Sequence, residues 1–466
     1  MASDNSPFSL TSAPPKAEND HNVYILGAGF SADAGFPVIK DFMNRMRDAA
    51  AWLEGKEERK EELRAVERVL EFRLRASSAA YRIPLNVENV EELFSLAATG
   101  GDNELAKAMP RAIAATLDYA RATTPDSENQ WFAVGAVEGL GAGKPTNWGP
   151  ISDQLAAAYQ NENPKRDWSN CPPYDFYLGL MCGYFNKGRT DRRDTIITFN
   201  YELTIEDALT HLGIDFSYGV AGQRLVKNSL GSYEAVPLSQ AKTQVLKLHG
   251  SVNWCSPAIR RKNPAEGLRE KSRISVLGHA FRETERTRRE ISAFNDYAEL
   301  LAHPENPQPY LVPPTWSKSL TVPLTSVWET AVKELSTATR IIILGYSIPP
   351  TDQHFRYLLA AGLRDNISLR KVFFVNPALA DERTKNDFEQ RLFGPLGLFR
   401  KEHLEQGIIE LAPVGLRHFL AESNQTNSDT YRLRIGRTVN KPTLQYEAAA
   451  PWRCFSHAGF GVPIFV

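Results

Sequence analysis

Polar residues of types that bind and process nucleotides stand directly after several short apolar runs of the chain. Gly27, Gly29 and Ser31 follow one such run, Asn200 follows a second and His249 a third. An imidazole titrates near neutrality and can accept a proton, whereas an amide can orient a water or a hydroxyl without adding charge. Glycines allow a tight turn that brings backbone amides close to a phosphate. This combination predicts a site for a phosphorylated ligand with proton-transfer chemistry.

The glycine turn matches part of a known nucleotide-binding pattern. Gly27-x-Gly29-x-x-Ala32 satisfies the glycine half of the dinucleotide-binding fingerprint, and Ser31 is a natural first residue for a helix. Glycines of this kind also occur in strand-to-helix turns for geometric reasons alone. A dehydrogenase would need a second strand ending in an acidic residue roughly twenty residues later. That region is charged and helical, with Asp48 inside it, so a dehydrogenase is disfavoured.

Two later apolar runs also end in polar residues. Gly345 and Ser347 follow the run 340–344, and Asn376 follows the run 371–375. The sequence Gly-Tyr-Ser-Ile-Pro around Ser347 resembles the nucleophile elbow of serine hydrolases. The second glycine of that motif is replaced by Pro349, and the later acid and histidine partners are too near in sequence. A serine hydrolase is therefore disfavoured.

The apolar runs predict how these residues are positioned. Runs at 23–26, 195–199, 244–248, 340–344 and 371–375 are continuous rather than alternating, which is typical of strands covered on both faces. A further apolar run at 408–411 is a candidate for one more strand after these. Helical segments lie between several of them, so we expect an α/β fold with a doubly wound, Rossmann-like parallel sheet. Ligands bind beyond the carboxyl ends of such strands, where all the polar residues above would lie.

The remaining segments define the expected domain organisation. Residues 1–20 read as a disordered leader and residues 21–420 as one nucleotide-binding domain. That domain would hold a helical insertion at about 41–185 and a basic insertion at about 257–310. From 41 to about 75, apolar residues recur at helical spacing, and the stripe consists of Leu63, Val66, Leu70 and Leu74. Residues 421–466 lose the strand–helix rhythm and form a C-terminal extension, which we interpret as an interface.

Composition narrows the classes of function. Lys and Arg number 54 against 55 Asp and Glu, so no overall field draws the chain to nucleic acid or membrane. The four cysteines form no C-x-x-C pair, and neither a zinc site nor a disulfide framework is expected. No apolar run spans a membrane and no signal peptide is visible, which favours a cytoplasmic protein. The segment 257–290 holds ten Arg and Lys against five Glu, which predicts either a solvated surface or contact with nucleic acid or an acidic partner.

Taken together, the motifs resemble the sirtuin superfamily, and within it the bacterial sirtuin-like proteins associated with phage defence. They span about residues 22–415 in the family's order and lie at 27–37 (GAGFSADAGFP), 198–202 (TFNYE), 247–251 (KLHGS), 344–352 (LGYSIPPTD) and 375–377 (VNP). By this resemblance, Asn200 lies beside the nicotinamide ribose of NAD and His249 is the catalytic base. The residues that it assigns to NAD binding are Gly27, Ala28, Gly29, Ser31, Asp33, Gly345, Ser347, Asp352 and Asn376.

Two departures from the protein-deacylating sirtuins affect the expected reaction. Those enzymes carry a four-cysteine zinc module after the His-Gly motif, and this chain has no such cysteines, so no metal is expected. The Phe-Arg pair that follows their glycine turn is replaced by the segment 38–41 (VIKD). Both differences weaken the case for binding an acyl-lysine peptide. Water is then the expected acceptor, and NAD is the substrate of a hydrolase that forms nicotinamide and ADP-ribose.

The resemblance also implies a biological setting. Defence-associated relatives deplete cellular NAD, are often oligomeric, and in some cases work beside a HerA-type ring ATPase or a short Argonaute. We therefore expect a homo-oligomer and a partner of one of these kinds, with no membrane association. Two alternatives stay open. The pocket could bind NAD or an ADP-ribose derivative as a sensor that acts through a partner, or the chain could be an NAD-dependent protein deacylase.

Overall fold

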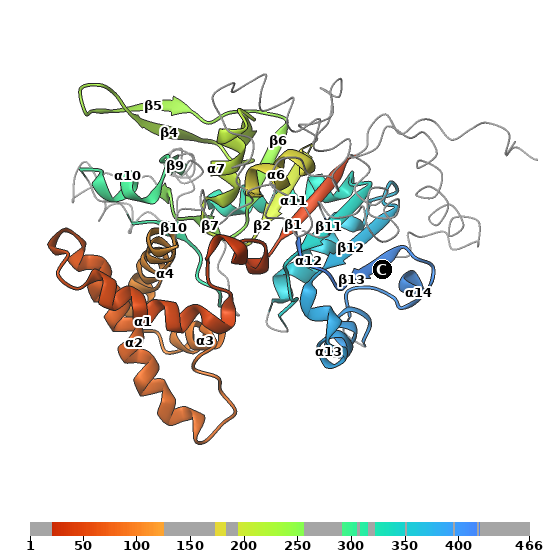
Figure 1. The fold of residues 1–466 in the computed structure, drawn as a ribbon, viewed down its shortest axis with the longest axis horizontal. Helices are drawn as coiled ribbons and strands as arrows, with labels where there is room; N and C mark the ends of the chain where they lie inside the picture. Colours follow the sequence, from red (N-terminus) through yellow and green to blue (C-terminus); the bar gives the residue numbers. More distant parts are fainter. Residues whose placement is uncertain are drawn as a thin grey trace, which may run out of the picture.

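The computed structural model describes residues 21–124, 173–182, 194–255, 291–304, 308–315, 322–349, 352–394, 397–416 and 419. Within these residues, seven parallel strands form a central sheet in the order β13-β12-β11-β1-β2-β6-β3 (Figure 1). The strands are β1 (Asn22–Leu26), β2 (Asp194–Thr198), β3 (Phe216–Ser217), β6 (Thr243–Lys247), β11 (Arg340–Leu344), β12 (Lys371–Val375) and β13 (Ile409–Ala412). The predicted doubly wound α/β fold is confirmed.

Both faces of this sheet are covered by helices. Successive side chains of a strand point to opposite faces, and all five positions of β1, β2 and β11 are buried. The helices of this part are α6 (Pro173–Met181), α7 (Thr204–His211), α11 (Val322–Ser336), α12 (Gln353–Leu363), α13 (Glu382–Phe393) and the short α14 (Glu402–Glu405). Helix α6 packs on α7, and α11 packs on α12.

The strand order creates a switch point at the centre of the sheet. From β1 the chain adds β2, then the edge strand β3, and then β6 between these two, before it crosses to β11 on the other side of β1. Because the strands are parallel, their carboxyl ends share one rim, and ligands of such sheets bind at this rim near the switch point. The residues that follow β1, β2, β6, β11 and β12 on this rim are Gly27, Phe199–Asn200, Leu248–His249, Gly345 and Asn376.

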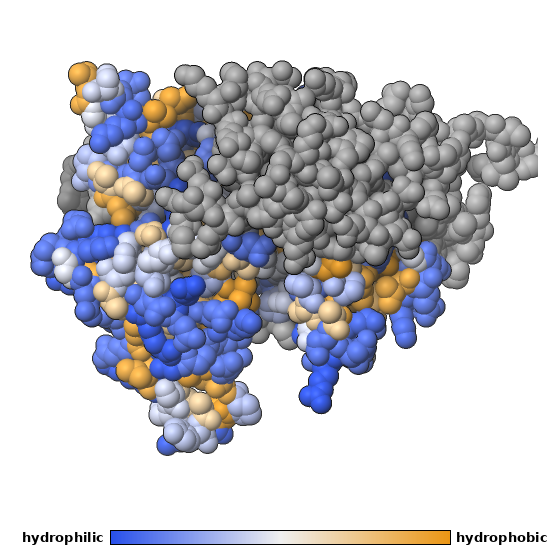
Figure 2. Space-filling view, in the orientation of Figure 1, coloured by the Kyte–Doolittle hydropathy of each residue, from blue (hydrophilic) through white to orange (hydrophobic). Residues whose placement is uncertain are grey.

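A helical lobe lies between β1 and β2 in the sequence. Its helices are α1 (Phe42–Leu53), α2 (Lys60–Ala80), α3 (Val90–Thr99) and α4 (Asn103–Thr123). They lie beside the sheet (Figure 1), and their apolar faces form a second cluster together with residues that follow β2 in the chain, such as Leu203, Val252 and Phe294. Figure 2 shows this lobe with a largely hydrophilic surface that apolar patches interrupt. The described part of the predicted insertion at 41–185 thus contains helices and no strand, and its outer limits stay a prediction.

One detail of the helical prediction is wrong. The segment 41–75 is not one helix, because the chain turns at Gly55, whose φ of 78° lies in the left-handed region. The predicted stripe faces the core along most of its length. Val66 is buried, Leu63 and Leu70 are half-buried against the apolar cluster, and only Leu74, at the end of the stripe, is 65% exposed. The buried face of α2 also includes Ala65 and Val69.

A second, four-stranded sheet was not predicted. Its order is β5-β4-β9-β8, and it is built from β4 (Gly222–Lys227), β5 (Tyr233–Pro237), β8 (Trp254–Cys255) and β9 (Ile291–Ala293). None of these strands is a long apolar run, and β5 is mostly exposed, so the sequence lacks the usual signal. A short pair joins β7 (Gly250–Ser251) to β10 (Tyr310–Leu311), and α10 (Tyr297–Ala302) lies between β9 and β10.

Several predicted segments lie outside the described residues, namely 1–20, 257–290 and 421–466. In the part of the chain that is described, no helix combines the length and the apolar character needed to cross a bilayer. The same residues contain no group of three or more potential metal ligands.

Candidate functional site

The glycine turn after β1 is built around a close contact with the turn after β11. The Gly27 N–H donates to the Leu344 carbonyl at 3.0 Å, and the Gly29 N–H donates to the Gly345 carbonyl at 2.9 Å. A Cβ on Gly29 would stand 2.8 Å from the Gly345 oxygen, and a Cβ on Gly345 would stand 2.3 Å from the Phe30 nitrogen. These glycines therefore allow two strand ends to touch at the switch point.

The turn continues differently from the prediction. No α-helix begins at Ser31; two 3-10 turns, 28–30 and 32–34, follow each other instead, and the Ser31 side chain caps neither of them. Ser31 is buried and its hydroxyl donates to the carboxylate of Glu202, which comes from the loop after β2. The Ser31 side chain thus links the turn after β1 to the loop after β2. Asp33 is exposed within the second turn.

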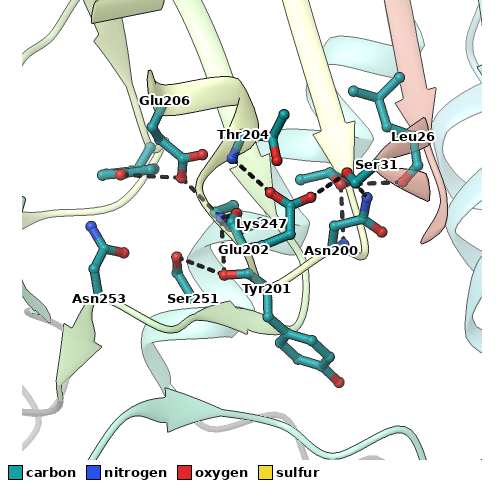
Figure 3. A network of polar contacts seen from close by, with 12 residues as sticks. Leu26, Ser31, Asn200, Tyr201, Glu202, Thr204, Glu206, Lys247, Ser251 and Asn253 are labelled. Atoms are coloured by element: carbon teal, nitrogen blue, oxygen red, sulfur yellow. Dashed lines mark hydrogen bonds and ion pairs between the residues drawn. The ribbon is translucent and has the colours of Figure 1, made fainter. Parts of the chain in front are cut away.

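The Asn200 amide is held in one orientation. Its Nδ2 donates to the Gly27 carbonyl and to the Ser31 hydroxyl oxygen, both at 3.0 Å (Figure 3). The Gly27 carbonyl can only accept a hydrogen bond, and the Ser31 hydroxyl already donates its hydrogen to Glu202. Both oxygen atoms therefore need a donor, and the amide nitrogen of Asn200 must be the atom that faces them. Asn200 Oδ1 is directed elsewhere, and it accepts no hydrogen bond from the described residues.

Glu202 fixes this arrangement from the other side. Its Oε1 accepts the hydrogen bond of Ser31, and its Oε2 accepts the Thr204 N–H at 2.6 Å at the start of α7. A chain of contacts thus runs from α7 through Glu202 and Ser31 to Asn200. Glu202 belongs to the TFNYE motif, but the sequence alone assigns it no role. Its partner Ser31 is distant in sequence, so no local spacing could have revealed the contact.

His249 lies on the same rim, one strand away from Asn200. It is buried, and its ring packs edge-on against Phe199 with centroids 5.2 Å apart and near Tyr201 at 5.9 Å. Phe199 and Tyr201 are the two sequence neighbours of Asn200. The β2 and β6 strands pair directly, so the amide and the imidazole stand at adjacent strand ends. The structure therefore brings together these two predicted residues and the glycine turn.

The comparison with known families bears on the same strands. Residues 194–394 match the family model described as a SIR2-like domain. The part of the chain from β2 to the end of α13 is therefore similar to this domain. The match begins at β2 and includes Asn200, His249, Ser347 and Asn376, which supports an NAD-related function of the sirtuin type. Among curated proteins, none matches the chain significantly.

The matched segment does not include β1, yet β1 belongs to the same site. It pairs with β2 on one side and with β11 on the other, and Gly27 receives the hydrogen bond of Asn200. The strand and glycine turn at 22–31 are thus built into the same sheet as the matched residues 194–394. The helical lobe is inserted between this strand and the matched part.

The loop after β11 is held by a buried tyrosine–aspartate contact. Tyr346 donates to Asp352 Oδ2 at 2.5 Å, and Asp352 Oδ1 accepts the Phe355 N–H at 3.4 Å as the N-cap of α12. Burial and the neighbouring Asp352 raise the pKa of Tyr346 well above its ordinary value. The Tyr346 ring stacks on Phe199 with centroids 5.0 Å apart. Asp352 therefore joins this loop to the start of α12.

Ser347 and Asn376 are placed on the rim but outside this contact chain. Ser347 is exposed, and the next residue, Ile348, has a φ of 51°. This left-handed conformation is unfavourable for a β-branched residue, and such conformations cluster at functional sites. Asn376 accepts the Ala378 N–H at 3.0 Å and caps the 3-10 turn Pro377–Ala380. Their assignments to NAD stay predictions.

A hollow of about 430 Å³ opens beside the glycine turn. Its walls are residues from 32–38, Asp41 directly before α1, and residues of α1 that include Arg45 and Asp48. It therefore lies where the sheet rim meets the helical lobe. Asn200 and His249 do not line it, so this hollow alone does not define the reaction centre.

A buried ion pair supports the two strand ends. Lys247, at the end of β6, is fully buried and its Nζ lies 2.9 Å from Glu206 Oε1 on α7. Burial raises the pKa of Glu206, and the Lys247 charge opposes that shift. Lys247 belongs to the KLHGS motif, but the sequence alone assigns it no role, because lysine is usually exposed and its burial has no local sequence signal.

Proposed function

We propose that the chain is an NAD glycohydrolase that cleaves NAD to nicotinamide and ADP-ribose. The observation that carries this proposal is the fixed amide of Asn200. Its nitrogen is used by Gly27 and Ser31, so its oxygen is free to orient a water or a ribose hydroxyl next to the His249 strand end. The match to the SIR2-like domain supports NAD as the ligand of this rim.

The reaction follows from these two groups. The bond between the nicotinamide nitrogen and ribose C1′ breaks, its electron pair returns to the pyridinium ring, and neutral nicotinamide leaves. The sugar passes through an oxocarbenium-like state, as in glycoside cleavage. Asn200 Oδ1 orients a water, whose oxygen bonds to C1′. His249 accepts the proton that the water loses and passes it to solvent.

Two sequence features support water rather than an acyl-lysine as the acceptor. The four cysteines form no C-x-x-C pair that could build the zinc module of the deacylases. The segment 38–41 also replaces the Phe-Arg pair of those enzymes. Protein deacylation is therefore the second candidate, and a sensor that binds NAD without cleaving it is the third.

The biological part of the proposal rests on the family resemblance. The chain would act in antiphage defence by depleting cytoplasmic NAD, as a homo-oligomer, with a HerA-type ring ATPase or a short Argonaute as partner. Contact with nucleic acid through residues 257–290 would supply a trigger.

Chromatography of the reaction products tests the proposed reaction. Purified protein is incubated with NAD, with and without DNA, beside the Asn200→Ala variant. We expect equimolar nicotinamide and ADP-ribose from the wild type and neither from the variant. Retained NAD binding without nicotinamide release would favour the sensor. Deacylation of an acetyl-lysine peptide that depends on NAD would favour the deacylase.

A further inference from the structure

Lys247 makes more contacts than its ion pair with Glu206. Its Nζ also lies 2.5 Å from the carbonyl oxygen of Glu202 and 3.3 Å from that of Tyr201 (Figure 3). An ammonium group has three N–H donors, so all three have an acceptor here. Two of the three acceptors are backbone atoms of the residues that directly follow Asn200.

These contacts join the two strand ends of the site. Lys247 is the last residue of β6 and stands two positions before His249, whereas Tyr201 and Glu202 belong to the loop after β2. The Tyr201 carbonyl also accepts the Val252 N–H at 3.0 Å and the Ser251 hydroxyl at 3.3 Å. The loop that carries Asn200 is therefore fastened to the chain on both sides of His249.

Stability alone does not require a buried lysine at this position. Replacing a buried ion pair by apolar residues of similar volume is often neutral or stabilising, whereas removing one partner alone is strongly destabilising. An apolar pair would, however, make no hydrogen bond to the carbonyls of Tyr201 and Glu202. The specific contribution of Lys247 is that its hydrogen bonds hold the backbone at 201–202 in one position.

We propose that Lys247 is a positioning residue for NAD cleavage. It fixes the backbone at 201–202, and thereby the direction of the Asn200 amide and the contact of Glu202 with Ser31. Glu206 compensates its buried charge. This inference rests on the proposed function, because it concerns the same reaction.

Three variants separate positioning from stability. Lys247→Met leaves Glu206 uncompensated and should lower both the melting temperature and kcat. The double variant Lys247→Met with Glu206→Leu removes both charges, so we expect its melting temperature to return toward that of the wild type. Its kcat should stay at least about tenfold below that of the wild type, with KM changed by less than about threefold. Amide hydrogens at 200–203 should exchange faster in this double variant.

Glu334→Gln is the matched control. Glu334 is fully buried on α11 and accepts the Thr195 hydroxyl at 2.8 Å near the amino end of β2, away from the rim. The Glu334→Gln variant should have a lower melting temperature than the wild type and an unchanged kcat. The inference is overturned if the double variant regains wild-type kcat and exchange rates, or if it remains as unstable as Lys247→Met. If the wild type releases no nicotinamide, the proposed function fails, and the exchange rates at 200–203 still decide whether Lys247 fixes this segment.

Discussion

At the scale of single residues, the site depends on which atom of the Asn200 amide faces inward. Gly27 and Ser31 both present an acceptor to it. Asn200→Asp keeps the shape but replaces the donor by an oxygen, and leaves these acceptors facing a negative charge. We expect a loss of about 1–3 kcal/mol in the free energy of unfolding, because a buried acceptor loses its partner. NAD cleavage should fall to background in a nicotinamide-release assay.

Asn366 provides a matched control for that substitution. It is buried, and its Nδ2 donates to the carbonyls of Leu335 at 2.6 Å and Ala338 at 3.0 Å, in the connection before β12. Asn366→Asp should cost a similar free energy of unfolding while the turnover of NAD stays at the wild-type level. Equal losses of turnover in the two variants would show that destabilisation, rather than the amide at the rim, explains the effect.

His249 tests the proton acceptor of the proposed reaction. Its ring packs on Phe199 and Tyr201, so His249→Ala removes a basic group and some aromatic packing. General base catalysis contributes about 10²–10⁴-fold, and we expect kcat to fall by that order while the fold is retained. Circular dichroism checks the fold. Near-normal turnover would mean that another group accepts the proton.

At the scale of elements, the contact between the turns after β1 and β11 holds the switch point together. Gly345 has a φ of 63°, and a Cβ there would stand 2.3 Å from the Phe30 nitrogen. Gly345→Ala should therefore lower both the melting temperature and NAD affinity. Gly213→Ala is the control, since its φ of 68° imposes similar backbone strain but nothing lies within 4 Å. If both variants lost NAD affinity equally, the close approach of the two turns would not matter for binding.

The far edge of the sheet supplies a prediction about pH. His403, on α14, is buried, and burial together with the nearby Arg400 lowers its pKa below the ordinary value of 6.5. A histidine with a depressed pKa in the folded state contributes stability that is present above the pKa of the unfolded chain. That stability is lost as the pH falls from about 6.5 through the lower folded-state pKa.

The measurement is denaturant unfolding of the wild type and of His403→Gln between neutral and acidic pH. The wild type should lose stability more steeply than the variant over this range. Parallel curves would show that His403 does not titrate with folding.

At the scale of the whole molecule, the sequence predicts the sheet best where burial is complete. The runs 340–344 and 371–375 match β11 and β12 at both ends, because continuous branched and aromatic residues suit strands buried on two faces. The hairpin of β4 and β5 lacks such a run, and none of its strand residues is buried. Its formation depends on β9, which is distant in sequence.

The features of the site also fall into those that the sequence predicts and those that it does not. Gly27, Asn200 and His249 could be predicted, because each follows a strand and a parallel sheet gathers its carboxyl ends. The contacts of Ser31 with Glu202 and of Lys247 with the loop carbonyls could not, since they depend on which polar groups are buried together.

The central claim is that one dinucleotide binds where the carboxyl ends of β1, β2, β6 and β11 meet. Amide hydrogen exchange of the Asn200→Ala variant, with and without NAD, tests it most directly, because a variant that does not cleave NAD holds it intact. We expect NAD to slow exchange at 27–35, 199–203, 248–252 and 345–349, and to leave the opposite rim at 337–340 unchanged. Protection confined to the opposite rim or to the helical lobe, or no protection at saturating NAD, would contradict this account.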